Sequence, residues 1–342
     1  MAFYKQLDED SKIQDVAIVT SGVFQDGVSN IETFFTSSTQ YSNTGDYSVD
    51  IYRYDPSNNA SASVQFGVAY GHVGGSGSLG TKGATGDRTT AAVYGQINNL
   101  INPPNTSRFT FGGNSSVDQV YAIVLNRARI REKMEPGGWE LHLHAGASGT
   151  AAKIKLIDDS STGPTTNERN FAPEYNIVSG TLSGGTTIAE AASADSTNGS
   201  YGSFYPSLGV ILLNPKRLQV APLLMASATA SNTDNRNDRL LYNSIKSGAY
   251  FQAKRQEEVT SRHYFVRATA GQFNMTTNET YYTKSAAGTR VIIPGLRTDP
   301  KTYITTVGLY NDTNELLAVA KLSKPILKSK SREALIKVKL DF

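Results

Sequence analysis

The sequence predicts a mainly β protein with antiparallel sandwich- or barrel-like domains, few short helices and long loops rich in Gly, Ser and Thr. The 342 residues include 30 Gly and 18 Tyr, and only 18% are charged, against about 25% in typical proteins. This composition favours strands and turns over long helices. Apolar residues also alternate with a period of two in many short segments, whereas helical spacing occurs in only two.

The first strand candidates lie in the N-terminal 131 residues. They cover residues 14–19, 47–54, 64–73 and 117–131. In the last of these segments Tyr121, Ile123 and Leu125 share one face, and the residues between them are also apolar. Two apolar faces predict a strand that is covered on both sides, at least as far as Leu125.

A hairpin is predicted around residues 136–138, where Pro is followed by two Gly. One face of the returning strand is apolar, with Trp139, Leu141, Leu143 and Ala145. The other face is polar, with Glu140, His142 and His144. This alternation is typical of a strand with one face toward a core.

Two segments have helical spacing. Apolar side chains recur every three or four positions between residues 88 and 101, and Asp87 can cap the start. Residues 238–247 form a second, shorter candidate, and Gly248 is its stop signal. Both segments are short enough to pack on a sheet.

The chain is predicted to contain two domains, since a domain typically has about 100–200 residues. We assign residues 1–237 to an N-terminal β-rich domain and residues 238–342 to a C-terminal β domain. The sequence changes character between about 150 and 205, and residues 181–203 are almost entirely Gly, Ser, Thr, Ala and Asn. Such a segment buries little apolar area, so we expect a loop or arm there that a partner orders.

The C-terminal domain is predicted to be a sandwich or barrel of short strands. Seven segments have strand character, at residues 250–258, 261–268, 270–274, 290–293, 303–310, 316–322 and 334–342. In the last one the even-numbered side chains from Ile336 to Phe342 are apolar, whereas Lys337 and Lys339 point the other way. We predict that the even-numbered face is buried and that the two lysines are candidate interface residues.

Several classes of protein are excluded by what the sequence lacks. There is no Cys, which excludes disulfides, thiolate zinc sites and a cysteine nucleophile. No apolar run approaches the roughly 20 residues of a membrane helix, and no secretory signal is recognisable. A net charge of +3 is too small for a protein that coats nucleic acid. We expect a chain that stays in the cytoplasm or leaves it by lysis or assembly, without membrane insertion or a nucleic-acid partner.

No motif of catalysis or cofactor binding is complete. Residues 75–80 have the glycine spacing of a dinucleotide-binding loop, but no helix follows directly and no acid lies about 20 residues further on. His142 and His144 could share a metal ion, yet no third ligand is near in sequence, so a solvated or cross-strand pair is favoured. Glycosidase carboxylates pair in space, so the sequence leaves that class open. We predict no catalytic, cofactor-binding or metal-ligating residues.

Charged side chains are unevenly distributed. Arg127, Arg129 and Arg131 would share one face of the strand predicted to run to residue 131, a pattern that can hold phosphate or the carboxylates of a neighbouring chain. We interpret it as an interface or surface stripe. The first 60 residues hold nine acids against three bases, and the last 42 hold eight bases against four acids. Ends of opposite sign can attract neighbouring subunits, although uneven solvated charge is the simpler explanation.

Four segments of the last hundred residues are distinctive. They read YNSIKSGAYFQA (242–253), ITTVGLYND (304–312), ELLAVAKLSKPI (315–326) and EALIKVKLDF (333–342). Together they resemble virion structural proteins of contractile-tailed phages, a family common among phages of marine cyanobacteria. In the N-terminal half, residues 64–71 and 120–131 are similar to two strands of that family. The strong match covers about a third of the chain and is more specific for the virion than for a place within it.

The resemblance implies a non-enzymatic structural subunit of a phage particle, with the tail or baseplate as the preferred place. It implies a homo-oligomer whose partners are other virion proteins and further copies of itself, assembled in the host cytoplasm and located in the virion, with no cofactors. Two other functions stay open, a host-surface adhesin or fibre-attachment module and a polysaccharide or cell-wall hydrolase. An adhesin should present an aromatic cleft or fibre repeats, and a hydrolase a pair of acids with raised pKa in a cleft.

Overall fold

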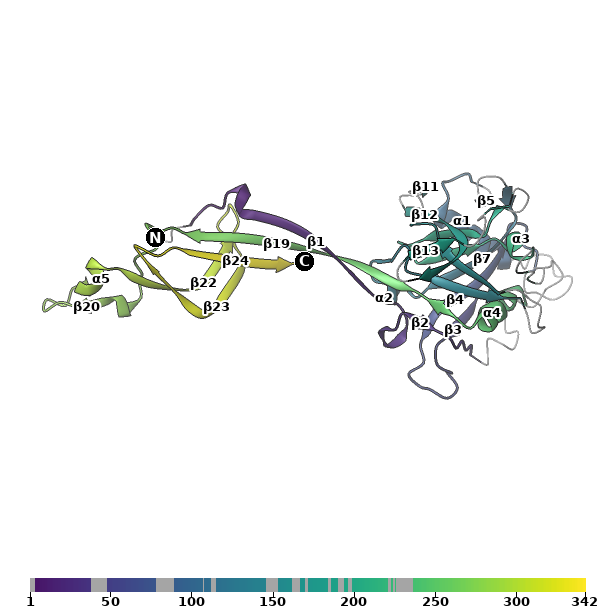
Figure 1. The fold of residues 1–342 in the computed structure, drawn as a ribbon, viewed down its shortest axis with the longest axis horizontal. Coiled ribbons are helices and arrows are strands. Elements are labelled where there is room, and N and C mark those ends of the chain that lie inside the picture. Colours follow the sequence, from purple (N-terminus) through teal and green to yellow (C-terminus); the bar gives the residue numbers. More distant parts are fainter. Residues whose placement is uncertain are drawn as a thin grey trace. The chain divides into compact units, whose positions relative to one another are not determined.

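The computed structural model divides the chain into two compact units (Figure 1). Unit 1 consists of Met1–Ala17 and Glu258–Phe342, and unit 2 of Ile18–Glu257. The structure describes residues 4–37, 48–77, 89–106, 108–111, 115–145, 153–161, 167–169, 172–183, 186–189, 194–195, 199–220, 223, 225 and 236–342. The chain passes between the units twice, within β1 (Lys12–Gly22) and β19 (Lys254–Ala268).

Unit 2 is built on one large antiparallel sheet, which has twelve strands in the described part of the chain. Ten strands follow the order β2-β18-β9-β10-β12-β16-β17-β7-β4-β3, while β11 (Asn167–Arg169) and β13 (Thr186–Ala189) pair with β12. The ten are β2 (Asn30–Ile31), β3 (Val49–Tyr52), β4 (Val64–His72), β7 (Gln119–Leu125), β9 (Glu140–His144), β10 (Lys153–Asp158), β12 (Ala172–Ser183), β16 (Gly202–Tyr205), β17 (Val210–Leu213) and β18 (Phe251–Gln252). Smaller pairs join β5 (Phe109–Phe111) to β6 (Ser115–Val117), β14 (Ala194–Asp195) to β15 (Gly199–Ser200), and β8 (Lys133–Met134) to β19.

The central strand β7 is covered on both faces from Val120 to Ile123, but the predicted cover does not reach Leu125 on both faces, since Val124 is 43% exposed. Tyr121 and Ile123 belong to the larger apolar cluster of unit 2, whereas Val120 and Ala122 belong to a second cluster. The strand ends at Leu125 and does not continue to residue 131. The predicted fold class, mainly β and antiparallel with few short helices, is confirmed.

Two helices supply the layers on either face of β7. Helix α1 (Thr89–Ile101) adds Tyr94 to the second cluster, and α4 (Arg236–Gly248) adds Leu241 and Ile245 to the larger one. Both confirm the helices predicted at residues 88–101 and 238–247. The other α-helices are short, α2 (Arg127–Ile130), α3 (Pro215–Leu218) and α5 (Pro294–Thr298). In the described part of the chain no helix is long and apolar enough to cross a membrane.

The two units differ from the predicted domains, residues 1–237 and 238–342. Helix α4 belongs to unit 2 because its apolar face, with Leu241 and Tyr242, is buried in the core of that unit. The following strand β18 pairs with both β2 and β9 of unit 2. At the other end, the first 17 residues join the C-terminal part of the chain because β1 lies beside β19 in one sheet.

The low-complexity segment, predicted as a loop or arm at about residues 150–205, contributes strands to the large sheet. β12 lies between β10 and β16, and β13 folds back on β12, where Ser183 pairs with Thr186. The prediction of a loop or arm is therefore wrong for these strands. Ile177 of β12 is buried in the larger apolar cluster, and backbone pairing with β13 holds residues 181–183, which needs no apolar side chain. The other residues of this segment lie outside the described residues.

Unit 1 consists mainly of two small sheets that share an apolar cluster. One has the order β1-β19-β24, and the other pairs β22 (Lys301–Tyr310) with β23 (Leu316–Ser329). Strand β24 (Ala334–Asp341) supplies two of the three buried members of the cluster, Ile336 and Val338, and β22 supplies Val307. A minor pair joins β20 (Tyr282–Lys284) and β21 (Arg290–Ile292).

The last strand follows the predicted alternation for most of its length. Ile336 and Val338 are buried and Leu340 is half-buried, whereas Lys337 and Lys339 are exposed. The expectation for Phe342 is wrong, since this side chain is 69% exposed. β24 ends at Asp341, and the Phe342 ring lies beyond it beside the Arg262 guanidinium, 5.7 Å from the ring centre.

Candidate protein interaction surface

The three arginines predicted to share a strand face do not do so. Residues 127–130 form helix α2 instead of continuing β7. Asn126 caps this helix, because its side chain accepts a hydrogen bond from the backbone N–H of Ala128. The helix turns successive side chains in different directions, so the predicted stripe is wrong.

Each of the three arginines is bonded within unit 2. Arg127 donates to the backbone carbonyl of Ser207 (2.7 Å), and Arg129 donates to the Ser63 hydroxyl (2.5 Å). Arg131 donates to both carboxylate oxygens of Glu257, at 3.1 Å each. These three partners lie on separate segments, so the arginines fix α2 within its own unit. Their predicted role as interface residues stays a prediction.

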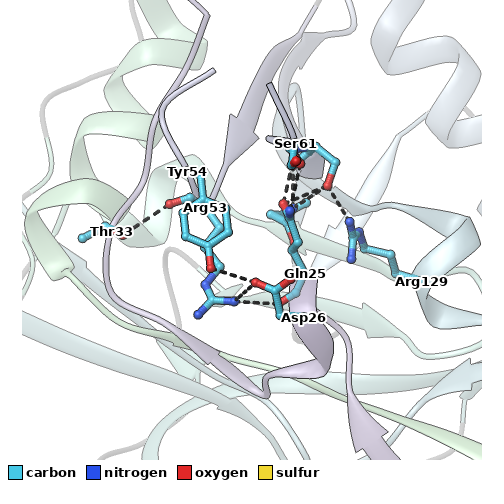
Figure 2. A network of polar contacts seen from close by, with 9 residues as sticks. Gln25, Asp26, Thr33, Arg53, Tyr54, Ser61 and Arg129 are labelled. Atoms are coloured by element: carbon cyan, nitrogen blue, oxygen red, sulfur yellow. Dashed lines mark hydrogen bonds and ion pairs between the residues drawn. The ribbon is translucent and has the colours of Figure 1, made fainter. Parts of the chain in front are cut away.

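Arg129 belongs to a polar network centred on Gln25 (Figure 2). The Gln25 side chain donates to the carbonyl of Ser61 (2.8 Å) and accepts from the Ser63 hydroxyl (2.9 Å). The Gln25 backbone N–H donates to the side chain of Gln65 (2.7 Å). One side chain therefore joins two loops that are about 40 residues apart in sequence.

Asp26 forms the acidic end of the same network (Figure 2). Its backbone is left-handed, with φ of 65°, at an Asp-Gly pair typical of a tight turn. The carboxylate accepts hydrogen bonds from Arg53 (2.9 Å) and from the Tyr54 hydroxyl (2.7 Å). The bond to Asp26 is the main cause of the raised pKa of Tyr54. In the sequence the Asp-Gly pair indicates the turn, but no local pattern indicates the network.

The two faces of β9 confirm the predicted alternation. Trp139, Leu141 and Leu143 are fully buried, and the opposite face carries Glu140 and His142. His142 Nε2 donates to one oxygen of Glu140, while the backbone N–H of Leu182 donates to the other at 2.8 Å. Burial alone would raise the pKa of Glu140, but these hydrogen bonds hold it below its ordinary value.

The Glu140–His142 pair has two parts of a catalytic triad but not its geometry. The second ring nitrogen of His142, Nδ1, is buried and has no hydrogen-bond partner among the described residues. The ring stacks on Tyr250, with centres 4.5 Å apart, and the Tyr250 hydroxyl donates to Gln252 instead. The pair therefore joins β9 to β12. In the part of the chain that the structure describes, no three His, Asp or Glu side chains are grouped to hold a metal ion.

Two buried carboxyl groups have a raised pKa because they are removed from water, Asp158 and Asp238. Both accept hydrogen bonds from backbone amides, Asp158 from Gly137 (2.9 Å) and Asp238 from Tyr70. The hollow that the described residues leave beside Asp238 has a volume of about 10 Å³, the space of one water molecule. A sugar ring does not fit this hollow beside Asp238, and the hydrogen bonds given above tie both carboxyls to the backbone around them.

The exposed face of β24 carries the other two predicted interface residues, Lys337 and Lys339. Leu335 is 66% exposed, and Lys337 and Lys339 follow on the same face of the strand. Lys337 lies 5.7 Å from the centre of the Phe265 ring, its cross-strand neighbour on β19. Lys339 pairs with Asp341 at 3.0 Å, with both side chains half exposed. The two lysines lie on a solvated face that mixes cations with apolar groups, and their role in an interface stays a prediction.

The β22–β23 pair exposes apolar groups as well. Tyr303 of β22 is 64% exposed, and Leu317 and Val319 of β23 are 68% and 52% exposed. Tyr310 packs edge-on against Tyr4, with ring centres 4.8 Å apart. Unit 1 therefore presents apolar side chains on both of its small sheets.

Three comparisons with known proteins found no match for this chain. No family model matches it, and no curated protein or solved structure matches it either.

Proposed function

We propose that this protein is a non-enzymatic structural subunit of a phage particle, with the tail or baseplate as its preferred place. It acts through contacts with further copies of itself and with other virion proteins, without a cofactor, nucleic-acid contact or membrane insertion. The resemblance of the last hundred residues to virion proteins motivates this proposal. The surface of unit 1 supports the central part of this proposal, namely that the protein associates with other protein chains.

The distribution of exposed apolar side chains is the main support for an assembly role. Among the described residues, 13 of the 17 large apolar side chains that are exposed belong to unit 1. In unit 1 they are Tyr4, Ile13, Val16, Phe273, Met275, Val291, Tyr303, Tyr310, Leu316, Leu317, Val319, Leu335 and Phe342. Single exposed apolar residues are normal, but a concentration of them marks an interaction surface.

The core of unit 1 is small in comparison. Its apolar cluster has three buried members, Val307, Ile336 and Val338, whereas the larger cluster of unit 2 includes Trp139, Phe66 and many others. Burying one more Leu or Val contributes roughly 1.5–3 kcal/mol. A partner that covers several of the exposed side chains would stabilise this unit by binding its folded state.

The proposal is tested in the particle itself. Mass spectrometry of purified particles from the virus that encodes this sequence should detect the chain in stoichiometric amount, and a cryo-EM reconstruction should place it in the tail or baseplate. Absence from purified particles contradicts the proposal. The purified protein should also release no product from peptidoglycan or host polysaccharide and should not retain labelled host cells. Turnover would favour the hydrolase, and cell binding the adhesin.

A further inference from the structure

The sheet β1-β19-β24 of unit 1 has two edges, and each edge is a long strand. β19 lies between β1 and β24, and in the described part of the chain each outer strand pairs on one side only (Figure 1). β24 has 8 residues, and β1 has 11, of which Lys12–Ala17 belong to unit 1. The outer row of backbone N–H and C=O groups on such an edge is a template for another strand.

The β1 edge is acidic. Between residues 4 and 17 there are four acids and two bases. Lys12 is paired with Glu9 at 3.0 Å, whereas Asp8, Asp10 and Asp15 form no ion pair with a described residue. All three are exposed. Three negative charges thus remain beside an edge strand whose apolar side chains, including Ile13 (51% exposed) and Val16 (48%), are also solvated.

The β24 edge has the opposite charge. Between residues 330 and 342 there are four bases and two acids. Glu333 is held by Arg267 at 2.7 Å, and Asp341 by Lys339 and by the Ser261 hydroxyl. Both acids are therefore used within the unit, while Lys337 contacts only the Phe265 ring among the described residues. Leu335 is the exposed apolar group of this edge.

We propose that copies of this chain associate head to tail, with the β1 edge of one copy pairing with the β24 edge of the next. Opposite charge at the two edges of one sheet attracts unlike edges of neighbouring copies. Pairing of like edges would place acids against acids or bases against bases, so a twofold edge-to-edge dimer is disfavoured. The occupant of each edge is therefore a second copy of this chain, as the proposed structural function requires.

This arrangement covers exposed groups on both sides of the new contact. It continues the sheet from one copy into the next, which satisfies the outer backbone groups of both edge strands. Ile13 and Asp15 share one face of β1 and come beside Leu335, Lys337 and Lys339 of the next copy, whereas Val16 lies on the other face of the continued sheet. Because the two surfaces are different, the contact repeats and generates a ring or an open filament.

Substitutions that reverse the charge of one edge or of both test this pairing in the full-length chain. The variants Asp10→Lys/Asp15→Lys and Lys337→Glu/Lys339→Glu each place like charges across the contact, and each should weaken self-association at least about tenfold in sedimentation velocity. An equimolar mixture of the two variants should associate again, and so should one chain that carries all four changes. Lys284→Glu/Lys324→Glu, which alters exposed lysines away from both edges, is the matched control and should associate as the wild type does.

Hydrogen exchange provides the second measurement. On assembly of the wild type, exchange should slow at alternate backbone amides of β1 and β24, because only every second amide points to the outer edge. A wild-type chain that stays monomeric, a mixture that fails to associate, or protection confined to other strands overturns the inference. A virion subunit that assembles through other surfaces also overturns it and leaves the proposed function standing. Head-to-tail oligomers of a chain that is absent from purified particles support the inference and contradict the proposed function.

Discussion

Gly71 of β4 lies directly against the backbone of Tyr94 in α1. A Cβ atom on residue 71 would lie 2.9 Å from both the nitrogen and the Cα of Tyr94. Tyr94 cannot retreat easily, because its hydroxyl donates to the carbonyl of Val117 (2.7 Å) and accepts from the N–H of Phe109 (3.0 Å). The glycine therefore sets how closely α1 packs on the sheet.

Gly71→Ala should destabilise unit 2 by roughly 1–3 kcal/mol, because the added methyl group forces α1 away from β4. The measurement is urea unfolding followed by circular dichroism. Gly95→Ala is the matched control in α1, since nothing lies within 4 Å of its added Cβ. It should stabilise the helix by up to about 1 kcal/mol. Equal effects of the two variants would contradict the close contact at Gly71.

Asp238→Asn should make unit 2 more stable at neutral pH. Burial raises the pKa of Asp238 well above its ordinary 3.8, although the Tyr70 amide and Arg239 partly offset this effect. Below pH 3.8 the carboxyl is protonated in both the folded and the unfolded state, so it does not lower the free energy of unfolding. As the pH rises, the unfolded chain releases its proton first, so the free energy of unfolding falls until the folded pKa is passed. Asn keeps the acceptor for the Tyr70 amide and cannot ionise.

The measurement for Asp238 is the free energy of unfolding as a function of pH. The difference between Asp238→Asn and the wild type should be small near pH 3 and should grow as the pH rises. Asp312→Asn, in the exposed turn between β22 and β23, is the control and should not change the pH dependence. A constant offset at every pH would contradict the role of the buried carboxyl.

The elements that the sequence predicts well are those with a local pattern. The alternation through Tyr121 and Ile123, apolar on both faces, predicts a strand covered on both sides, and β7 is one from Val120 to Ile123. The spacing of apolar residues between 88 and 101 predicts α1. In β24 the pattern identifies the buried Ile336 and Val338 and the exposed lysines, and it fails only at Phe342, beyond the end of the strand.

The remaining features depend on contacts between distant segments, which a local pattern does not contain. The arginine stripe fails because the cap by Asn126 ends the strand, although Arg127 to Arg131 alternate as a strand would. The predicted boundary at residue 237 misses the packing of Leu241 against the core of unit 2. The network around Gln25 joins residues about 40 positions apart, and only folding brings them together.

Lys328 is fully buried in unit 1, and its three N–H groups have three acceptors. They donate to the carbonyls of Ala270 (3.0 Å) and Ser329 (2.8 Å) and to the Asn274 side chain (2.9 Å). Lys328→Met keeps most of the volume but removes all three hydrogen bonds. The Ala270 and Ser329 carbonyls then keep only the bonds from the Asn274 amide (2.7 Å) and the Arg332 N–H (3.3 Å). Unit 1 should therefore lose on the order of 2–5 kcal/mol of stability. Lys330→Met, two residues further on and exposed, should lie within about 0.5 kcal/mol of the wild type. Similar midpoints of urea unfolding for both variants would show that the hydrogen bonds of Lys328 contribute little.

Val338→Ala and Lys337→Ala separate the stability of β24 from its proposed role in association. Val338 is 6% exposed and packs with Val307 and Ile336, so its truncation should cost unit 1 roughly 1–3 kcal/mol. Lys337 is exposed, and losing its contact with the Phe265 ring should cost less than about 1 kcal/mol. Lys337→Ala should nevertheless weaken self-association, because it removes a positive charge from the β24 edge. Urea unfolding and sedimentation velocity of both variants test this division. A Lys337→Ala protein that associates like the wild type, or that unfolds as early as Val338→Ala, would contradict it.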